Sequence, residues 1–166
     1  MQYTTKAQLE RINQQIKELA GVYRAAVSGL GISENEFWIW YALINMDGEL
    51  SQQDICGAWA FSKQTVNTII SHMVKNHYAT LEAIPGTRNR KHIRLTEEGR
   101  RFGERIVIPF AEAEVRALER IPLDERSACI AVLAKYAALL REELRAGPAG
   151  SGSGAQGRHP QEGDLP

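Results

Sequence analysis

Cysteine and long apolar runs are both scarce in this chain of 166 residues. Cys56 and Cys129 are the only cysteines, too few for a disulfide framework, which favours a reducing compartment. No apolar run approaches the roughly 20 residues that cross a bilayer, and no apolar signal core follows Lys6. We therefore expect a cytoplasmic protein without membrane contact and, at this length, one domain with its own core.

The sequence also lacks the motifs of common enzymes and metal-binding proteins. It has no phosphate-binding glycine loop, no glycine-flanked serine elbow and no metal-binding His-Glu pair. His72 and His77 are five residues apart, which does not place them on one helix face, and His92 lies in another segment. No spacing of Cys and His matches a zinc site. We expect no catalytic residues, no metal and no cofactor.

Acidic residues are almost missing from the middle of the chain, although the formal net charge is zero. Between positions 62 and 94, Glu82 is the only acid. The basic residues of this segment are Lys63, Lys75, Arg88, Arg90, Lys91 and Arg94. Because charge within a Debye length of a contact dominates binding, a neutral chain with such a segment can still bind phosphates.

Apolar periodicity predicts two helices at the start of the chain. Apolar residues spaced by three and four predict a helix over about 9–27. Ser33, with Glu36 three residues later, has the capping-box pattern and predicts the start of the second helix. The following run over 37–44 is apolar on all sides, so we expect it to be buried between two other layers and to end at Asp47.

Two short helices joined by a tight turn come next. Ser51, with Asp54 as reciprocal partner, begins the first, and Ser62 begins the second, which runs to about Asn76. The second helix has an apolar face of Val66, Ile69, Ile70, Met73 and Val74. Its other face is polar and carries no acid. This is the pattern of a helix-turn-helix, whose second helix enters the major groove of DNA.

A basic hairpin follows the two short helices. Residues 78–84 and 92–95 have the composition and alternation of strands, and Pro85 begins a turn between them. The tip, residues 86–91, is polar and basic, as in a DNA-binding wing. The sequence thus places a wing directly after the helix-turn-helix.

Two further helices and a tail complete the chain. Thr96 is expected to cap a long helix that Pro109 kinks, because proline cannot donate a hydrogen bond to the preceding turn. Pro122 marks the turn into a last helix. From Gly147 onward, Gly, Ser, Pro and Gln predominate, and we expect disorder over 147–166.

Three local motifs carry a family resemblance. They read G-E-L-S-Q-Q-D-I at 48–55, S-K-Q-T-V-N at 62–67 and L-T-E-E-G at 95–99. With this order and spacing, and with the predicted order of elements from 9 to 144, the chain resembles the MarR family of winged helix-turn-helix transcription regulators.

The resemblance implies a mostly α-helical fold with a small β-wing. A winged helix-turn-helix lobe would cover residues 33–96, and residues 1–32 and 97–146 would form dimerisation helices. The implied function is that of a homodimeric transcription regulator, a repressor by family expectation, that binds a pseudo-palindromic operator in double-stranded DNA. Many members carry an acid before the wing arginines, but Thr87 stands there in this chain, so either Arg88 or Arg90 could enter the minor groove.

The side chains of the second short helix and of the wing suit DNA. Amides hydrogen-bond adenine in two places, and threonine methyls contact thymine. Helix N-termini bind phosphates, and arginines favour the narrow minor groove of A·T-rich DNA. The predicted DNA-binding residues are Ser51, Gln52, Ser62, Lys63, Gln64, Thr65, Asn67, Thr68, Ser71, His72, Arg88, Asn89, Arg90 and Lys91.

An effector site is expected at Tyr23, Trp38, Trp40 and Tyr41, where the family resemblance implies binding of small aromatic or anionic molecules. An apolar cleft with a few polar tips suits such a ligand, although these rings could equally be aromatic core. The alternatives are a metal trigger or a thiol trigger at Cys56, which is expected in a helix interior where thiols are normally inert. A winged-helix module that binds protein instead of DNA is a further alternative, which a flat salt dependence would reveal.

Overall fold

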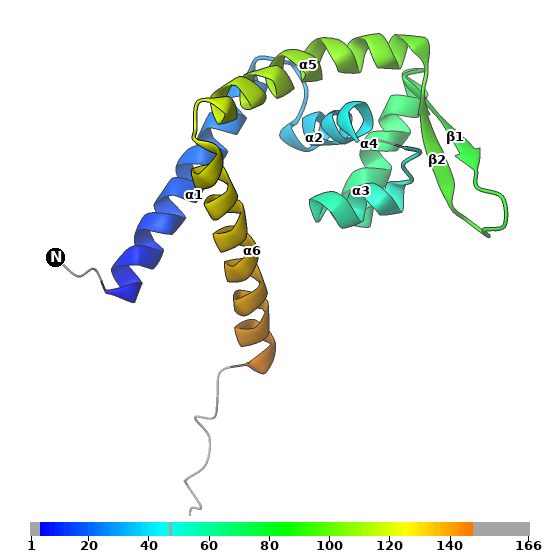
Figure 1. Ribbon diagram of the computed structural model, residues 1–166. Helices are drawn as coiled ribbons and strands as arrows, with labels where there is room; N and C mark the ends of the chain where they lie inside the picture. Colours follow the sequence, from blue (N-terminus) through cyan, green and yellow to red (C-terminus); the bar gives the residue numbers. More distant parts are fainter. Residues whose placement is uncertain (1–3, 47, 148–166) are drawn as a thin grey trace, which may run out of the picture. The chain divides into compact units, whose positions relative to one another are not determined.

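The computed structural model describes residues 4–46 and 48–147, which form helices and one two-stranded sheet (Figure 1). The elements are α1 (Thr5–Ser28), α2 (Glu34–Asn45), α3 (Gln52–Trp59), α4 (Lys63–Lys75), β1 (Ala79–Ala83), β2 (Lys91–Leu95), α5 (Glu97–Glu119) and α6 (Leu123–Ala146). The chain divides into two units, Met1–Val115 and Arg116–Pro166. Across the described ranges, no helix is both long and apolar enough to span a bilayer. The predicted fold, mostly α-helical with a small β-wing, is confirmed.

Side-chain caps fix where the helices begin. The Ser33 hydroxyl accepts a hydrogen bond from the Glu36 amide, and the Ser62 hydroxyl accepts one from the Thr65 amide. Ser51 and Asp54 form the full reciprocal capping box at α3. The predicted helix starts are therefore confirmed at α2, α3 and α4. The predicted end of α2 at Asp47 lies outside the described residues.

The core of the first unit is built around α2. Phe37, Ile39 and Trp40 of this helix are fully buried, and α2 contacts α1, α3 and α4. From α4, the buried residues are Val66, Ile70 and Met73. The prediction that α2 is buried between other layers is confirmed, since residues on several sides of the helix are shielded from solvent.

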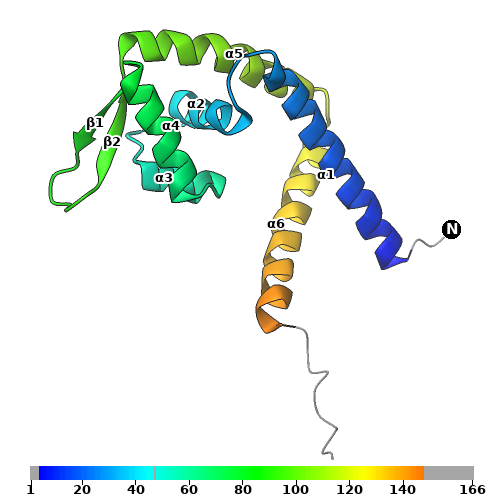
Figure 2. The same ribbon diagram turned by 180° about the vertical axis from the view of Figure 1, so that it is seen from behind.

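The two strands form the predicted hairpin. β1 and β2 are antiparallel, with Ala79 opposite Leu95 and Ala83 opposite Lys91. The Ile93 amide donates a 2.8 Å hydrogen bond to the Leu50 carbonyl, which ties β2 to the segment before α3. In both ribbon views the tip of the hairpin points away from the helices (Figures 1 and 2). The hairpin is thus anchored at its base and exposed at its tip.

The start of α5 packs closely on the chain before β1. The Gly99 amide donates a 3.0 Å hydrogen bond to the Thr96 hydroxyl, and that hydroxyl donates one of 2.7 Å to the His77 carbonyl. A Cβ atom at Gly99 would lie 1.9 Å from the Tyr78 carbonyl oxygen, so only glycine fits there. Further along, α5 continues through Pro109 to Glu119.

The helices α1 and α6 carry large apolar side chains on their surfaces. In α1, Val27 is the only buried residue that the structure describes, and Val22 is 61% exposed. In α6, none of the described side chains is buried, and Ile130 is 68% exposed. The tail beyond Gly147, predicted to be disordered, lies outside the described residues. Each of the two helices therefore presents an apolar face that its own unit does not cover.

Candidate functional site

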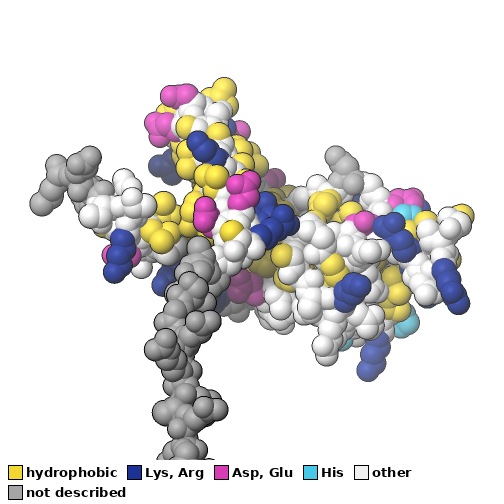
Figure 3. Space-filling view, turned by 90° about the horizontal axis from the view of Figure 1, so that it is seen from below, with side chains coloured by type: hydrophobic (Ala, Val, Ile, Leu, Met, Phe, Trp, Pro, Cys, Tyr) yellow, Lys and Arg dark blue, Asp and Glu magenta, His cyan; other side chains and the backbone are white. Residues whose placement is uncertain are grey.

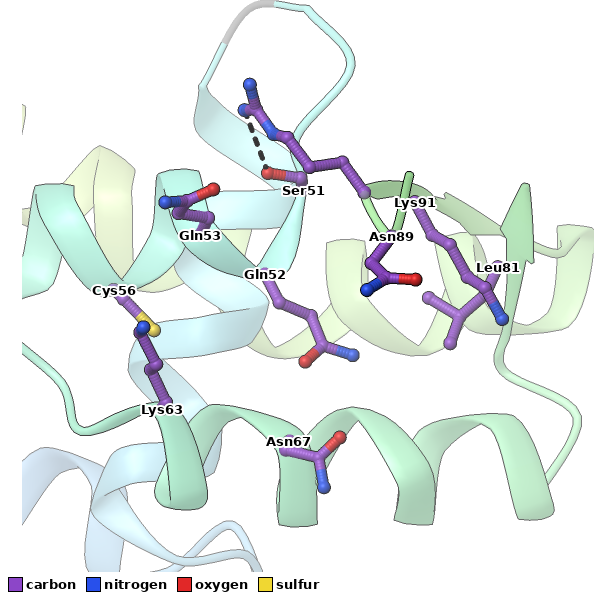
Figure 4. Close-up of a pocket in the computed structure, with 10 residues that line it drawn as sticks. Ser51, Gln52, Gln53, Cys56, Lys63, Asn67, Leu81, Asn89 and Lys91 are labelled. Carbon is purple, nitrogen blue, oxygen red and sulfur yellow. Dashed lines mark hydrogen bonds between the residues drawn. The ribbon is translucent and has the colours of Figure 1, made fainter. Parts of the chain in front are cut away.

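Helices α3 and α4 and the hairpin border an open pocket of about 640 Å³ (Figure 4). Its lining combines cations, amides, a hydroxyl, a thiol and one aliphatic side chain. These residues are Ser51, Gln52, Gln53, Cys56, Lys63, Asn67, Leu81, Asn89, Arg90 and Lys91. In the close-up, the Gln52 side chain extends into the space between α3 and α4. None of these lining residues is acidic, so the pocket can accept anionic groups and hydrogen-bond neutral ones.

The outer face of α4 is polar and accessible. Gln64, Asn67, Thr68 and Ser71 are exposed, opposite the buried apolar face. Lys63, also exposed, begins the helix, and no acidic residue occurs in its first turn. Amide and hydroxyl groups on an accessible helix can hydrogen-bond base edges in a major groove.

Other predicted contacts on α4 have partners within the chain. The Thr65 hydroxyl lies 2.8 Å from the Ser62 hydroxyl, at the start of the helix. His72 Nε2 lies 2.9 Å from Asn76 Nδ2, near the end of the helix. These hydrogen bonds would compete with contacts to a ligand at Ser62, Thr65 and His72.

Ser51 caps α3 through contacts within the chain. Its side chain is buried, with 2% of the residue exposed, and its hydroxyl donates a 2.6 Å hydrogen bond to Asp54 Oδ2. Hydrogen bonds from the Ser51 hydroxyl and amide, together with the charge of Arg90, hold the pKa of Asp54 below its usual value. The Ser51 hydroxyl therefore completes the α3 cap, and its predicted phosphate contact stays a prediction.

The wing arginines have different surroundings. Arg90 Nη2 lies 3.1 Å from Asp54 Oδ1 and 3.4 Å from the Ser51 hydroxyl. Arg88, two residues earlier, is exposed near the tip and has no hydrogen bond or ion pair with any described residue. Arg90 thus links the hairpin to α3, whereas the Arg88 charge is available to a partner.

The base of the hairpin carries a second group of ion pairs. Arg94 pairs with Glu82 at 3.1 Å and also with Glu49. The hydrogen bonds to Glu82 and Glu49 raise the pKa of Arg94. His92 Nε2 lies 3.2 Å from Glu49 Oε2. These contacts neutralise charge at the base and leave the basic excess nearer the tip.

The surface of the winged part shows the same charge distribution. Seen from below, the part that carries the hairpin shows separate Lys and Arg side chains on a mostly polar surface, with few acidic ones (Figure 3). The exposed lysines of the pocket lining, Lys63 and Lys91, come from α4 and β2. The two elements therefore contribute positive charge to one face.

The predicted effector residues do not all lie together. Trp38 contacts Tyr23 and Tyr41, with ring centroids 5.3 and 5.4 Å apart. Trp40 is fully buried and packs instead on Tyr78 and Phe102. The Trp40 ring thus belongs to the core beside α5, apart from the other three residues predicted to bind an effector.

The structure adds four residues to this aromatic group. Trp59 stacks on Trp38 at 5.1 Å, and Phe37 and Phe110 also contact the Trp38 ring. The Tyr41 hydroxyl donates a 2.8 Å hydrogen bond to Glu114 Oε2. These partners were not predicted from the sequence, although the four-residue spacing of Phe110 and Glu114 places both on one face of α5.

Glu114 changes the ionisation of two tyrosines. Burial, followed by the hydrogen bond and the charge of Glu114, raises the pKa of Tyr41 to about 12. The same causes in the same order raise the pKa of Tyr23. Both phenols therefore remain neutral at physiological pH, and Glu114 supplies the formal charge at this site.

The two cysteines are unpaired and differ in exposure. Cys56 is half-buried and lines the pocket, so the expectation that it lies in a helix interior is only partly met. Cys129 is exposed on α6. Within the described residues, no group of three or more His, Cys, Asp or Glu side chains could hold a metal ion.

No family model matches the sequence, and comparison with curated proteins finds no match. Comparison with solved structures does find similar folds. A MarR family regulator from Neisseria meningitidis has a TM-score of 0.74 at 18% identity, covering 85% of this chain and 99% of that one. The alignment thus spans most of both chains.

Two further similar structures belong to DNA-binding proteins. MepR of S. aureus, solved in a DNA-binding conformation, has a TM-score of 0.63 at 20% identity, covering 83% of this chain and 99% of its own. BpsR of Bordetella bronchiseptica, whose DNA binding is regulated by 6-hydroxynicotinic acid, has a TM-score of 0.61 at 19% identity, with coverage of 82% and 98%. The chain has the winged-helix fold of MarR family regulators.

Proposed function

We propose that the chain is a MarR-type transcription regulator that binds duplex DNA through α4 and the hairpin. The observation that carries this proposal is the acid-free polar face of α4 beside a hairpin with the exposed Arg88 near its tip. In winged helix-turn-helix proteins, the second helix of the motif enters the major groove. The fold shared with DNA-binding neighbours supports the same assignment.

The side chains on α4 favour particular bases. Gln64 and Asn67 are exposed amides, and amides pair with adenine in two places. The exposed Thr68 offers a methyl group to thymine. Arg88 suits the narrow, electronegative minor groove of A·T-rich DNA. We therefore propose an A·T-rich operator, with half-sites about one helical turn apart if the protein binds as a dimer.

A fluorescence-anisotropy titration tests DNA binding directly. The purified chain is titrated against duplexes tiled across the region upstream of its own gene, at several salt concentrations. We expect one tile to bind tightest, with log K falling steeply as log salt rises, because phosphate contacts release counterions. Binding that is flat with salt would contradict the proposal and indicate a protein-binding module.

We further propose that residues 1–32 and 97–146 form a homodimer, with 33–96 as the DNA-binding lobe. The apolar faces of α1 and α6 support this assignment. Leu19 and Val22 on α1 are 54% and 61% exposed, and Leu133 and Leu144 on α6 are 53% and 74% exposed. Apolar area of this extent is unfavourable in water, and a second copy would cover it.

A charge placed on the α6 face tests the dimer. Leu133→Glu is expected to convert a dimer into a monomer, because burying a carboxylate in an apolar interface is costly. Light scattering coupled to size-exclusion chromatography measures the mass. Lys135→Glu, an exposed position on the same helix, is the matched control and should remain dimeric. If the Leu133→Glu protein had the mass of a dimer, this face of α6 would not belong to the dimer interface.

We also propose that the protein represses transcription and responds to a small ligand at Tyr23, Trp38 and Tyr41. A dimer bound at a promoter would block polymerase. A ligand would favour the conformation that fits DNA less well, by no more than its difference in affinity for the two states. The ligand-regulated DNA binding of BpsR, a protein of the same fold, supports this part of the proposal.

A further inference from the structure

The aromatic site contains three rings that are only partly shielded from solvent. Trp38 and Trp59 are stacked at 5.1 Å, with planes 27° apart. Tyr41 meets both rings edge-on, with centroids 5.4 and 5.7 Å away. All three rings are only half-buried. Since they come from α2 and α3, two helices of the winged lobe hold one aromatic surface that solvent reaches.

The charged side chain beside these aromatic rings is the carboxylate of Glu114. Glu114, also half-buried, accepts a hydrogen bond from Tyr41, and, after the effect of burial, its hydrogen bonding and charge also raise the pKa of Tyr23. A carboxylate offers about four acceptor positions, so the Tyr41 phenol leaves acceptor capacity for a ligand. Among the described residues, Glu114 is the carboxylate that, after burial, raises the pKa of both tyrosines through its hydrogen bonding and charge. It places a negative charge beside the aromatic rings.

We propose that the group Tyr23, Trp38, Tyr41, Trp59, Phe110 and Glu114 binds a small organic cation, such as an ammonium with an aromatic substituent. Aromatic faces attract cations through their quadrupole and do so more strongly where water is excluded. A carboxylate within the same group attracts a cation and repels an anion. This inference narrows the expected aromatic or anionic effector to a cation, and its regulatory consequence rests on the proposed function.

A matched pair of probes tests the sign of the preferred charge. Benzyltrimethylammonium and phenylacetate each join a benzyl group to one charge, of opposite sign. Two of the three tryptophans, Trp38 and Trp59, lie in the aromatic site, so intrinsic fluorescence reports its occupancy. With the full chain and no DNA present, we expect the cation to saturate the quenching at a concentration at least tenfold lower than the anion.

Substitutions at Glu114 test whether the carboxylate causes this preference. Glu114→Gln is expected to weaken binding of benzyltrimethylammonium at least fivefold, whereas Glu114→Asp, which keeps the charge, should lose less. Glu98→Gln removes the same charge from an exposed position of α5 and should leave affinity unchanged. Circular dichroism of each variant confirms that it is folded. The proposal would be overturned if phenylacetate bound more tightly than benzyltrimethylammonium. It would also be overturned if Glu114→Gln bound benzyltrimethylammonium as tightly as the unsubstituted chain does.

The outcome is independent of DNA binding. Charge-selective quenching that depends on Glu114 would support the inference even if no duplex bound the protein. Conversely, salt-dependent binding of one duplex would support the proposed function even if neither probe quenched fluorescence. The absence of quenching by benzyltrimethylammonium would overturn only the inference that the aromatic site binds a cation.

Discussion

Replacing Gly99 with alanine is expected to lower the free energy of unfolding by at least about 3 kcal/mol. The added Cβ would lie 1.9 Å from the Tyr78 carbonyl oxygen and 2.7 Å from its carbonyl carbon. Both are backbone atoms, so no rotamer change relieves the overlap. That carbonyl also accepts a 3.0 Å hydrogen bond from the Thr96 amide, which moving α5 would break. Urea unfolding monitored by circular dichroism at fixed protein concentration measures the loss.

The same substitution at Gly57 is the matched control. Gly57 is exposed inside α3, and an added Cβ would meet nothing within 4 Å. Gly57→Ala should therefore raise the free energy of unfolding by up to about 1 kcal/mol, the difference in helix propensity between the two residues. A Gly99→Ala protein with the urea midpoint of the unsubstituted chain would show that α5 can move away from Tyr78 without cost.

Local sequence patterns predicted the elements of the winged lobe well. Ser33, Ser51 and Ser62 each cap a helix through a group three residues later, and such contacts are readable from sequence because both partners are neighbours. The buried α2 was also predictable, since a run without a polar face leaves few alternatives. The similarity of fold to MarR family regulators confirms the assembly of these elements.

Contacts between distant residues were not predictable in this way. Tyr41 and Glu114 are 73 positions apart, and Arg90 and Asp54 are 36 apart, so no local pattern links them. The role of Arg90 becomes apparent only when the hairpin is folded against α3. The motif that includes Gly99 is visible in the sequence, but the backbone contact with Tyr78 that requires glycine is not.

The separation of Trp40 from Trp38 and Tyr41 could have been predicted from helical geometry. Residues two apart on an α-helix point about 200° away from each other at 3.6 residues per turn. Trp38 and Tyr41, three apart, share a face, whereas Trp40 must point to the opposite side. The structure shows this separation, with Trp38 in the aromatic site and Trp40 in the core.

Arg88→Ala is expected to weaken DNA binding at least tenfold at moderate salt. Arg88 is exposed near the wing tip and has no ion pair among the described residues, so its charge is free to contact DNA. Each phosphate neutralised by a cation contributes about 0.9 to the slope of log K against log salt. If Arg88 neutralises one phosphate, the slope should fall by about that amount. Anisotropy titrations of the best duplex at several salt concentrations measure both quantities.

Arg90→Ala removes an arginine side chain two residues away. Comparing it with Arg88→Ala distinguishes a residue that contacts DNA from one that positions the hairpin. Asp54 already neutralises Arg90, with 3.1 Å between Nη2 and Oδ1. Arg90→Ala should therefore weaken binding by loosening the hairpin while leaving the salt slope nearly unchanged. Because a loosened hairpin also displaces Arg88, the double variant should lose less affinity than the two single effects added together. If Arg90→Ala lowers the slope and Arg88→Ala does not, Arg90 leaves Asp54 to contact DNA, and the roles assigned to the two arginines are reversed.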